Sequence, residues 1–308
     1  MMFKNSLKLF ASNFDKVWKY LLYSIIVLGI VIGLMMPYLS VLKKVIASNW
    51  TSSILDKIPS TGLLYGSDVA GLFGAIWDFL YGCLKMLFTT YLGAGIYFAF
   101  LLLFFLPFLL NIGKYTVNEM LYNYMSSQTK LGFCVALVKT LKSSVLYAAL
   151  KTIMSLFVKA IYAVMFYAIA SVDAKIFSYF LPIIVIISFA FVGALSQTFV
   201  SGWAPASVVC GFNIFKSYRI GIRSVFRRYL RVLSTSFLIN MIFIFLLMGF
   251  GLVSAVILVP LYLGLNNMFE MVMFFGSQGM RYYIDGEKFL TPKKLEQTDN
   301  IQKTKYLL

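Results

Sequence analysis

The chain has 308 residues, of which 61% are hydrophobic and 12% are charged. An average soluble domain carries about 25% charged residues, so this chain lacks the polar side chains that would coat a soluble fold. In a soluble protein, the formal charge of +16 would favour a nucleic-acid partner. Here the basic residues flank apolar runs, so we expect the lipid bilayer and anionic phospholipid as partners, and no nucleic acid.

Several kinds of site are excluded by what the sequence lacks. It contains no histidine, which removes the usual general base and the imidazole metal ligand. Cys83, Cys134 and Cys210 are far apart and have no metal-ligand spacing. No phosphate-binding loop, nucleophile elbow or zinc-protease motif occurs. We therefore predict that the protein is not an enzyme and has no catalytic residue, no metal and no cofactor.

Six apolar segments are each long enough to cross a bilayer, which takes about 20 helical residues. The first is a span and not a cleavable signal, because it is too long for a signal's apolar region. The stretch 71–88 is apolar but contains Asp78 and Lys85, and the sequence leaves open whether it spans, re-enters or lies at the interface. The spans are placed at about 20–42, 89–112, 147–170, 177–199, 233–250 and 256–280.

These segments predict an all-α fold: a polytopic membrane helical bundle with basic amphipathic helices at the interface. Residues 1–285 are expected to form a single integral membrane domain, and residues 286–308 a polar cytoplasmic tail. If the N-terminus is inside, the inner segments carry 21 of the 27 basic residues and the outer segments carry five. Because cytoplasmic loops are enriched in Lys and Arg, we expect a multi-pass plasma-membrane protein with both termini in the cytoplasm.

A repeat is indicated by two segments, Phe3–Leu22 and Phe215–Ser234, which align without gaps. The matched pairs include Lys4 with Lys216, and a looser third copy begins at Lys130. Each copy would be a basic surface helix leading into a hairpin of two spans, which gives three repeated helix-hairpin units. Duplication and biased composition both explain the match, and the sequence leaves the two open.

A stripe of basic side chains marks the predicted helix over residues 215–232. Its members are three or four residues apart, so they share one face of the helix, and no acidic residue interrupts them. Such a helix lies in the headgroup plane, where it acts as a topology anchor, as a binding site for anionic lipid or as a docking site for a protein. The candidate lipid-headgroup residues are Lys216, Arg219, Arg223, Arg227 and Arg231.

Two charged residues fall inside predicted spans, Lys159 in the third and Glu270 in the sixth. Charged groups in lipid are costly and usually face the interior of the bundle. Their depths are similar, so we predict an intramembrane polar pair, with Asn240, Asn266 and Asn267 as hydrogen-bond partners. The pair would serve either as a structural clip or as part of a substrate path.

A family resemblance covers residues 124–307. The segments that carry it are 124–127 (YMSS), 197–205 (QTFVSGWAP), 226–228 (FRR), 269–285 (FEMVMFFGSQGMRYYID) and 292–296 (PKKLE). They resemble a family of uncharacterised multi-spanning membrane proteins of Gram-positive bacteria, and the layout is similar to the membrane domain of some glycerophosphodiester phosphodiesterases. The resemblance implies a bacterial plasma membrane. The phosphodiesterase barrel is absent, so that activity is not implied.

Two functional hypotheses follow. The first is a non-enzymatic membrane protein that engages anionic lipid or an envelope partner through its inner basic helices. The alternative is a small transporter or permease with a path between the third and sixth spans.

Overall fold

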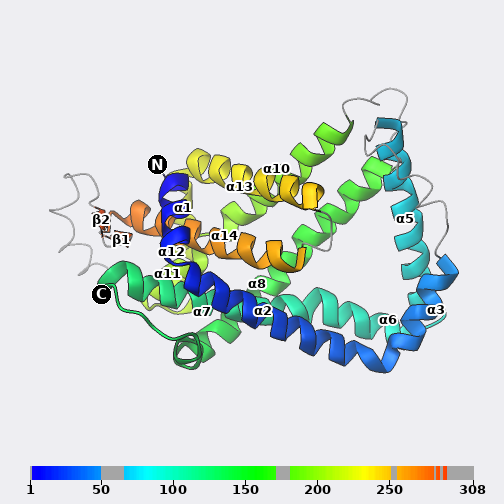
Figure 1. Ribbon diagram of the computed structural model, residues 1–308, viewed down its shortest axis with the longest axis horizontal. Coiled ribbons are helices and arrows are strands. Elements are labelled where there is room, and N and C mark those ends of the chain that lie inside the picture. Colours follow the sequence, from blue (N-terminus) through cyan, green and yellow to red (C-terminus); the bar gives the residue numbers. More distant parts are fainter. Residues whose placement is uncertain are drawn as a thin grey trace. The chain divides into compact units, whose positions relative to one another are not determined.

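The structure is a computed structural model that describes residues 2–49, 66–170, 181–250, 255–280, 282–284 and 287–289 (Figure 1). Nearly all of these residues are helical, which confirms the all-α prediction. Six helical segments among them are long and apolar enough to cross a membrane, as predicted from the sequence. They are Phe14–Asn49, Leu92–Ser127, Phe133–Met165, Ile186–Cys210, Tyr229–Leu247 and Ile257–Gln278.

The elements follow one another as helices separated by short breaks. The N-terminal part comprises α1 (Met2–Ser12), α2 (Phe14–Met35), the 3-10 turn η1 (Met36–Tyr38), α3 (Leu39–Asn49), α5 (Gly66–Thr89), α6 (Leu92–Ala99), the π-helical segment η2 (Phe100–Phe105), α7 (Leu106–Ser127) and α8 (Phe133–Ala170). The C-terminal part comprises α10 (Leu181–Val200), α11 (Trp203–Cys210), α12 (Ile214–Phe226), α13 (Tyr229–Phe250), α14 (Ala255–Gln278) and the strands β1 (Tyr282–Ile284) and β2 (Glu287–Phe289).

The chain forms two compact units. The first unit contains Met1–Val27, Phe108–Lys151 and Gly193–Leu308, and the second contains Leu28–Pro107 and Thr152–Val192. The long helices α2, α8 and α10 each contribute one end to each unit.

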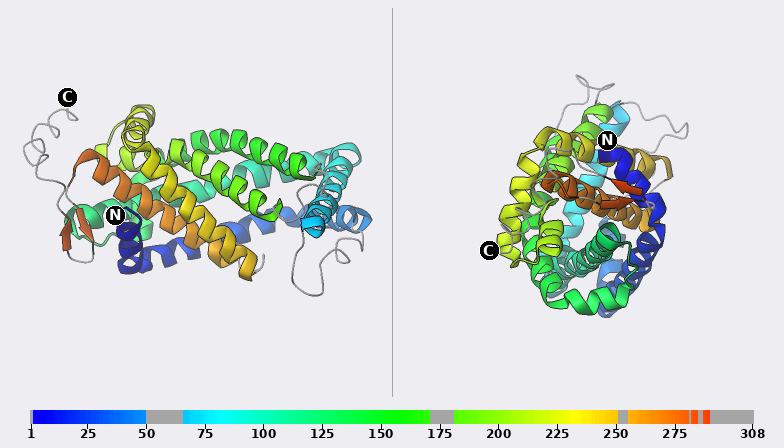
Figure 2. Two further views of the ribbon diagram at one scale, coloured as in Figure 1. Left: turned by 90° about the horizontal axis from the view of Figure 1, so that it is seen from above. Right: turned by 90° about the vertical axis from the view of Figure 1, so that its left-hand side faces the viewer.

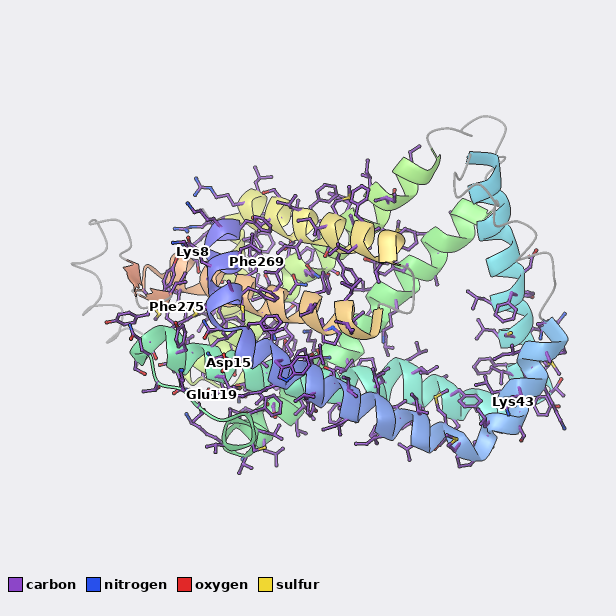
Figure 3. The ribbon with its side chains drawn as sticks, in the orientation of Figure 1. Lys8, Asp15, Lys43, Glu119, Phe269 and Phe275 are labelled. Atoms are coloured by element: carbon purple, nitrogen blue, oxygen red, sulfur yellow. The ribbon has the colours of Figure 1, made fainter. Side chains whose placement is uncertain are left out.

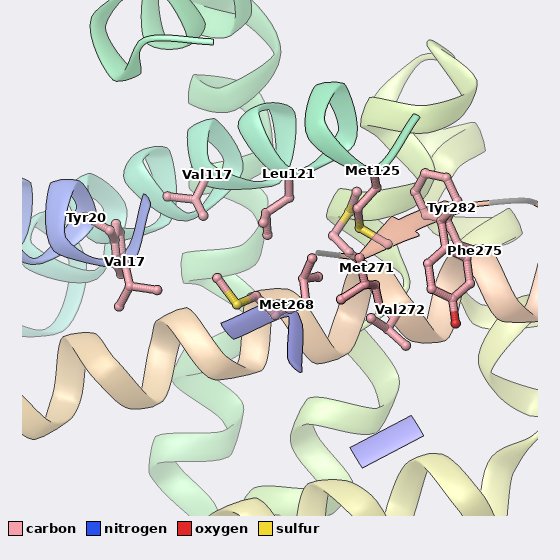
Figure 4. Close-up of a cluster of buried hydrophobic side chains, with 12 residues drawn as sticks. Val17, Tyr20, Val117, Leu121, Met125, Met268, Met271, Val272, Phe275 and Tyr282 are labelled. Carbon is pink, nitrogen blue, oxygen red and sulfur yellow. The ribbon is translucent and has the colours of Figure 1, made fainter. Parts of the chain in front are cut away.

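The core of the first unit lies between α7 and α14. Residues 112–121 of α7 and 266–275 of α14 are buried on all sides, which marks both as central helices. The ends of α1 and α2 pack against them, and α1 lies beside α14 (Figures 1 and 2). Figure 4 shows the resulting cluster, which comprises Leu9, Val17, Tyr20, Val117, Leu121, Met125, Met268, Met271, Val272, Phe275, Tyr282 and Ile284.

A short antiparallel hairpin, β1 with β2, follows α14 and pairs Tyr282 with Phe289. The Tyr282 hydroxyl accepts a hydrogen bond from Asn5 Nδ2 at 3.0 Å, which ties the hairpin to α1. Burial raises the pKa of the Tyr282 hydroxyl, so this group stays neutral at physiological pH. The rest of the predicted polar tail, residues 290–308, lies outside the described residues.

The second unit contains α3, α5 and α6, which pack around Val45, Leu87, Ala94 and Phe98. The ambiguous stretch 71–88 lies in α5 and is therefore helical. Among the described residues, α5 does not belong to the helices that are long and apolar enough to span a membrane.

The two segments of the clearest sequence repeat have the same design. In the first, α1 ends at Ser12 and α2 begins at Phe14; in the second, α12 ends at Phe226 and α13 begins at Tyr229. The predicted continuous helix over 215–232 is therefore wrong, because a turn at 227–228 interrupts it. The third copy differs again, since α8 runs unbroken from Phe133 to Ala170.

Helices α11 and α12 touch through their backbones at two glycines. A Cβ atom added at Gly202 would lie 2.4 Å from the Gly221 carbonyl oxygen, and one added at Gly221 would lie 2.6 Å from the Gly202 carbonyl carbon. Small residues allow such close approach between membrane helices. By contrast, a Cβ atom on Gly29 or Gly33 of α2 would meet no described atom within 4 Å.

We expect the Gly221→Ala substitution to destabilise the protein by about 1–3 kcal/mol, because two backbones would have to separate to make room for one methyl group. Thermal unfolding of the detergent-purified protein measures the effect. Gly29→Ala is the matched control and should be neutral or slightly stabilising, since alanine has the higher helix propensity. Equal melting temperatures for the two variants would show that the glycine contact is unimportant.

Candidate functional site

A buried ion pair joins the two central helices of the first unit. Lys114 Nζ on α7 lies 2.5 Å from Glu270 Oε1 on α14, and the two side chains are 8% and 4% exposed. The span predicted to end near residue 112 had placed Lys114 in a polar segment beyond it. Instead, α7 continues as a helix to Ser127, so Lys114 lies inside the bundle.

Helix α8 adds two further polar residues, Tyr147 and Lys151, which lie one turn apart. Tyr147 is fully buried, with its ring centroid 5.3 Å from that of Tyr115 and 5.2 Å from that of Trp203. The Lys151 ammonium lies 5.4 Å from the centroid of the Tyr147 ring. It is also close enough to interact electrostatically with Lys114 and Glu270. Three helices thus bring polar groups to one place.

Several polar atoms on these three helices are buried and have no hydrogen-bond partner among the described residues. Asn118 follows Lys114 by one helical turn, and Asn266 and Asn267 precede Glu270 by about one turn, so they share faces with the ion pair. An unpaired buried polar group costs about 1–3 kcal/mol, so a site of this kind needs additional partners. The unpaired atoms are Asn118 Nδ2 and Oδ1, Tyr147 Oη, Asn266 Nδ2, Asn267 Nδ2 and Oδ1, and Glu270 Oε2. We call these residues, with Lys114 and Lys151, the polar cluster.

The structure records a different partner for Lys159. Its ammonium donates to the Leu103 carbonyl oxygen at 2.8 Å, within the second unit. In a regular α-helix this carbonyl would accept from the backbone N–H of residue 107, and Pro107 has no N–H to donate. Glu270 is paired with Lys114 instead. The predicted Lys159–Glu270 pair is therefore replaced by two separate arrangements.

The predicted asparagine partners of Glu270 divide in the same way. Asn266 and Asn267 belong to the polar cluster, whereas Asn240 Oδ1 accepts a hydrogen bond from the Tyr262 hydroxyl at 2.5 Å. A neighbouring acid on α7, Glu119, is held by Lys139 at 2.5 Å and is labelled in Figure 3.

The sequence could have revealed Lys114 and Lys151. Lys114 with Asn118, and Tyr147 with Lys151, are polar pairs at a spacing of four residues in apolar helices, which marks one polar face on each. The predicted topology places Lys114 in an inner segment between spans, so the sequence did not indicate it as a partner for Glu270.

The basic stripe is on the surface, as predicted for a headgroup-binding face. Its members come from three places, because α12 ends at Phe226. The opposite face of α12, with Ser217, Gly221 and Ser224, is buried. The exposed members are Lys216, Arg219 and Arg223 on α12, Arg227 in the turn and Arg231 on α13.

Exposed apolar side chains lie next to this stripe. Phe215, Phe226 and Leu230 are exposed by 64%, 55% and 77%. Basic groups together with exposed aromatic and aliphatic ones are the composition of an interfacial helix, which places its apolar side chains among the acyl chains.

No group of three Cys, Asp or Glu side chains within the described ranges could hold a metal ion. The fold and the polar cluster define a class, namely a polytopic helical membrane protein with a charged site inside the bundle. Comparison with family models, with curated proteins and with solved structures finds no match to the chain. The site is therefore interpreted from its own geometry.

We expect Glu270→Met to destabilise the protein by about 3–5 kcal/mol, because Lys114 and Lys151 would be left without a counter-charge. Adding Lys114→Met should recover part of the loss, since one unbalanced charge is removed with it. Melting temperatures of the two single variants and the double variant form a cycle that isolates the pair's interaction. Strictly additive losses would exclude an energetic coupling between the two residues.

Proposed function

We propose that this integral membrane protein acts without catalysis and engages anionic phospholipid through the basic stripe. The observation that carries the proposal is the exposure of all five stripe residues beside exposed Phe215, Phe226 and Leu230. The stripe supplies positive charge for phosphate headgroups, and the apolar groups supply contacts to the acyl chains.

The first repeat segment supports the same assignment. Lys4 and Lys8 on α1 are exposed, as are Lys216 and Arg219 on α12. Both short helices precede a break and then a membrane-spanning helix, which is a suitable position for an interfacial segment. The proposal places both helices, and both termini, on the cytoplasmic side of the plasma membrane, where anionic lipids give a negative surface potential.

Neutralising three stripe residues together, Arg219→Gln, Arg223→Gln and Arg227→Gln, should weaken binding of phosphatidylglycerol about a hundredfold. The reason is that each basic residue near the surface contributes about 1 kcal/mol. Native mass spectrometry of the delipidated protein, titrated with phosphatidylglycerol or phosphatidylcholine, measures the change. The matched control neutralises three other exposed lysines, Lys43, Lys44 and Lys85.

An equal loss in the control would show that net charge, and not the stripe, determines lipid binding. Unchanged binding in the triple arginine variant would remove the proposal. Labelling of a cysteine at position 216 from outside intact cells would contradict the proposed orientation.

A second candidate function is a small transporter or permease. One observation favours it: the polar cluster contains Tyr147 and Lys151 from the third span together with Asn266, Asn267 and Glu270 from the sixth. Polar groups deep in a helical bundle commonly mark the path of a substrate or ion.

If such a path exists, a cysteine introduced at Asn267 should react with a membrane-impermeant thiol reagent. The reason is that a path for a polar solute must be filled with water, and the water-soluble reagent enters by the same path. The experiment uses a background in which Cys83, Cys134 and Cys210 are replaced by serine, and a cysteine at exposed Phe157 of α8 serves as a lipid-facing control. A cysteine at 267 that stays as unreactive as the control would exclude a water-filled path.

A further inference from the structure

When both of its lysines are protonated, the polar cluster carries one more positive charge than negative charge. It contains two lysines, Lys114 and Lys151, and one carboxylate, Glu270, which is bonded to Lys114 through Oε1 only. Charges of one sign interact strongly at short range in a low-dielectric interior, so an uncompensated charge is costly there.

The cluster also contains several unpaired hydrogen-bond donors. Its unpaired donors include the amide nitrogens of Asn118, Asn266 and Asn267 and the hydroxyl of Tyr147. The lysine ammonium groups add N–H bonds, since each has three. The unpaired acceptors of the cluster are the amide oxygens of Asn118 and Asn267, Oε2 of Glu270 and the Tyr147 hydroxyl, which can donate or accept.

We propose that the polar cluster is a binding site for a small oxyanion group, a carboxylate or a phosphate. Its negative charge balances the second lysine, and its oxygen atoms accept from the asparagine amides, the tyrosine hydroxyl and the ammonium groups. A metal cation fits poorly, because the two lysines repel it.

Water molecules alone would satisfy the hydrogen bonds but would leave a protonated Lys151 without a counter-charge. Buried waters typically make about three hydrogen bonds each to otherwise unpaired groups, and several would be needed here. The charge balance therefore distinguishes an oxyanion from a hydrated cluster.

The position of the donors suits an anion held between helices. Asn118 lies one turn beyond Lys114 on α7, Asn267 lies one turn before Glu270 on α14, and Lys151 approaches from α8. The group could belong to a soluble anion or to a lipid headgroup, which share this chemistry.

This proposal goes beyond the lipid-binding stripe, none of whose residues belongs to the cluster. It also names a substrate class, small oxyanions, for the permease candidate. That extension rests on the proposed permease function, which requires that water reaches the cluster. The two proposals can fail independently, because the cluster can bind an anion even if the stripe binds no lipid.

The experiment titrates the full-length protein, purified in a neutral detergent, with millimolar inorganic phosphate, acetate and dihexanoyl phosphatidylglycerol. Dihexanoyl phosphatidylcholine is the zwitterionic reference. Affinity is measured by isothermal titration calorimetry and by the rise in melting temperature that a ligand of the folded state produces. The variants are Lys151→Met, Lys151→Arg, Asn118→Leu and the exposed control Lys142→Met on the same helix.

We expect an anion to bind wild type and Lys142→Met alike. Binding should be about tenfold to a hundredfold weaker in Lys151→Met and in Asn118→Leu, and Lys151→Arg should restore it, because a charged hydrogen-bond partner is lost or kept. The triple arginine variant of the stripe should bind phosphate or acetate as wild type does. Binding of phosphate or acetate identifies a free oxyanion, and binding of phosphatidylglycerol alone identifies a lipid headgroup.

Two results would overturn the proposal. The first is that none of the three probes binds the wild-type protein, which needs no variant to fold. The second is that Lys151→Met and Lys142→Met bind with equal affinity, which would mean that the anion binds elsewhere and that the cluster holds only water.

Discussion

The ion pair between Lys114 and Glu270 is the constraint around which the first unit is arranged. A charge in a bundle of apolar helices has no bulk water to solvate it, so each ion needs a fixed partner. The pair fixes the register of α7 against α14, and the hydrophobic cluster of Val117, Met268 and their neighbours packs along the same two helices. Asn118, Asn266 and Asn267 lie within about one turn of the pair on these two helices.

In the second unit, a charged side chain is also paired, but its partner is a backbone carbonyl and not an acid. Within the described part of the chain Lys159 forms no ion pair, and its ammonium donates to the backbone carbonyl of Leu103. Pro107 cannot donate the α-helical bond to that carbonyl, and Leu103 itself lies in the π-helical segment Phe100–Phe105. The helix defect thus supplies an acceptor at a depth where lipid offers none.

The sequence predicted the features that depend on average composition and local period. Apolar runs of sufficient length gave six spans, and a spacing of three to four residues gave an exposed basic face. It did not predict the partner of Glu270. Counting depth along separate spans says nothing about which helices are neighbours, and the distribution of basic residues assigned Lys114 to a loop.

The glycines also show that a local sequence pattern does not predict which helices are neighbours. Gly29 and Gly33 carry the familiar spacing of a packing motif, yet no described atom would meet a Cβ at either position. Gly202 and Gly221 have no motif, since one caps the start of α11 and the other lies in α12, and their backbones are in contact. Close packing depends on the pairing of faces in space, which a local pattern does not contain.

That backbone contact has a mechanical consequence. A side chain can change its rotamer to accommodate a small displacement. Two backbones in contact at glycine have no side chain between them that could do so. We therefore expect helices α11 and α12 to move together. A tilt of the surface helix, imposed by the lateral pressure or thickness of the leaflet around it, would be transmitted to Trp203, whose ring lies against Tyr147 at the edge of the charged interior.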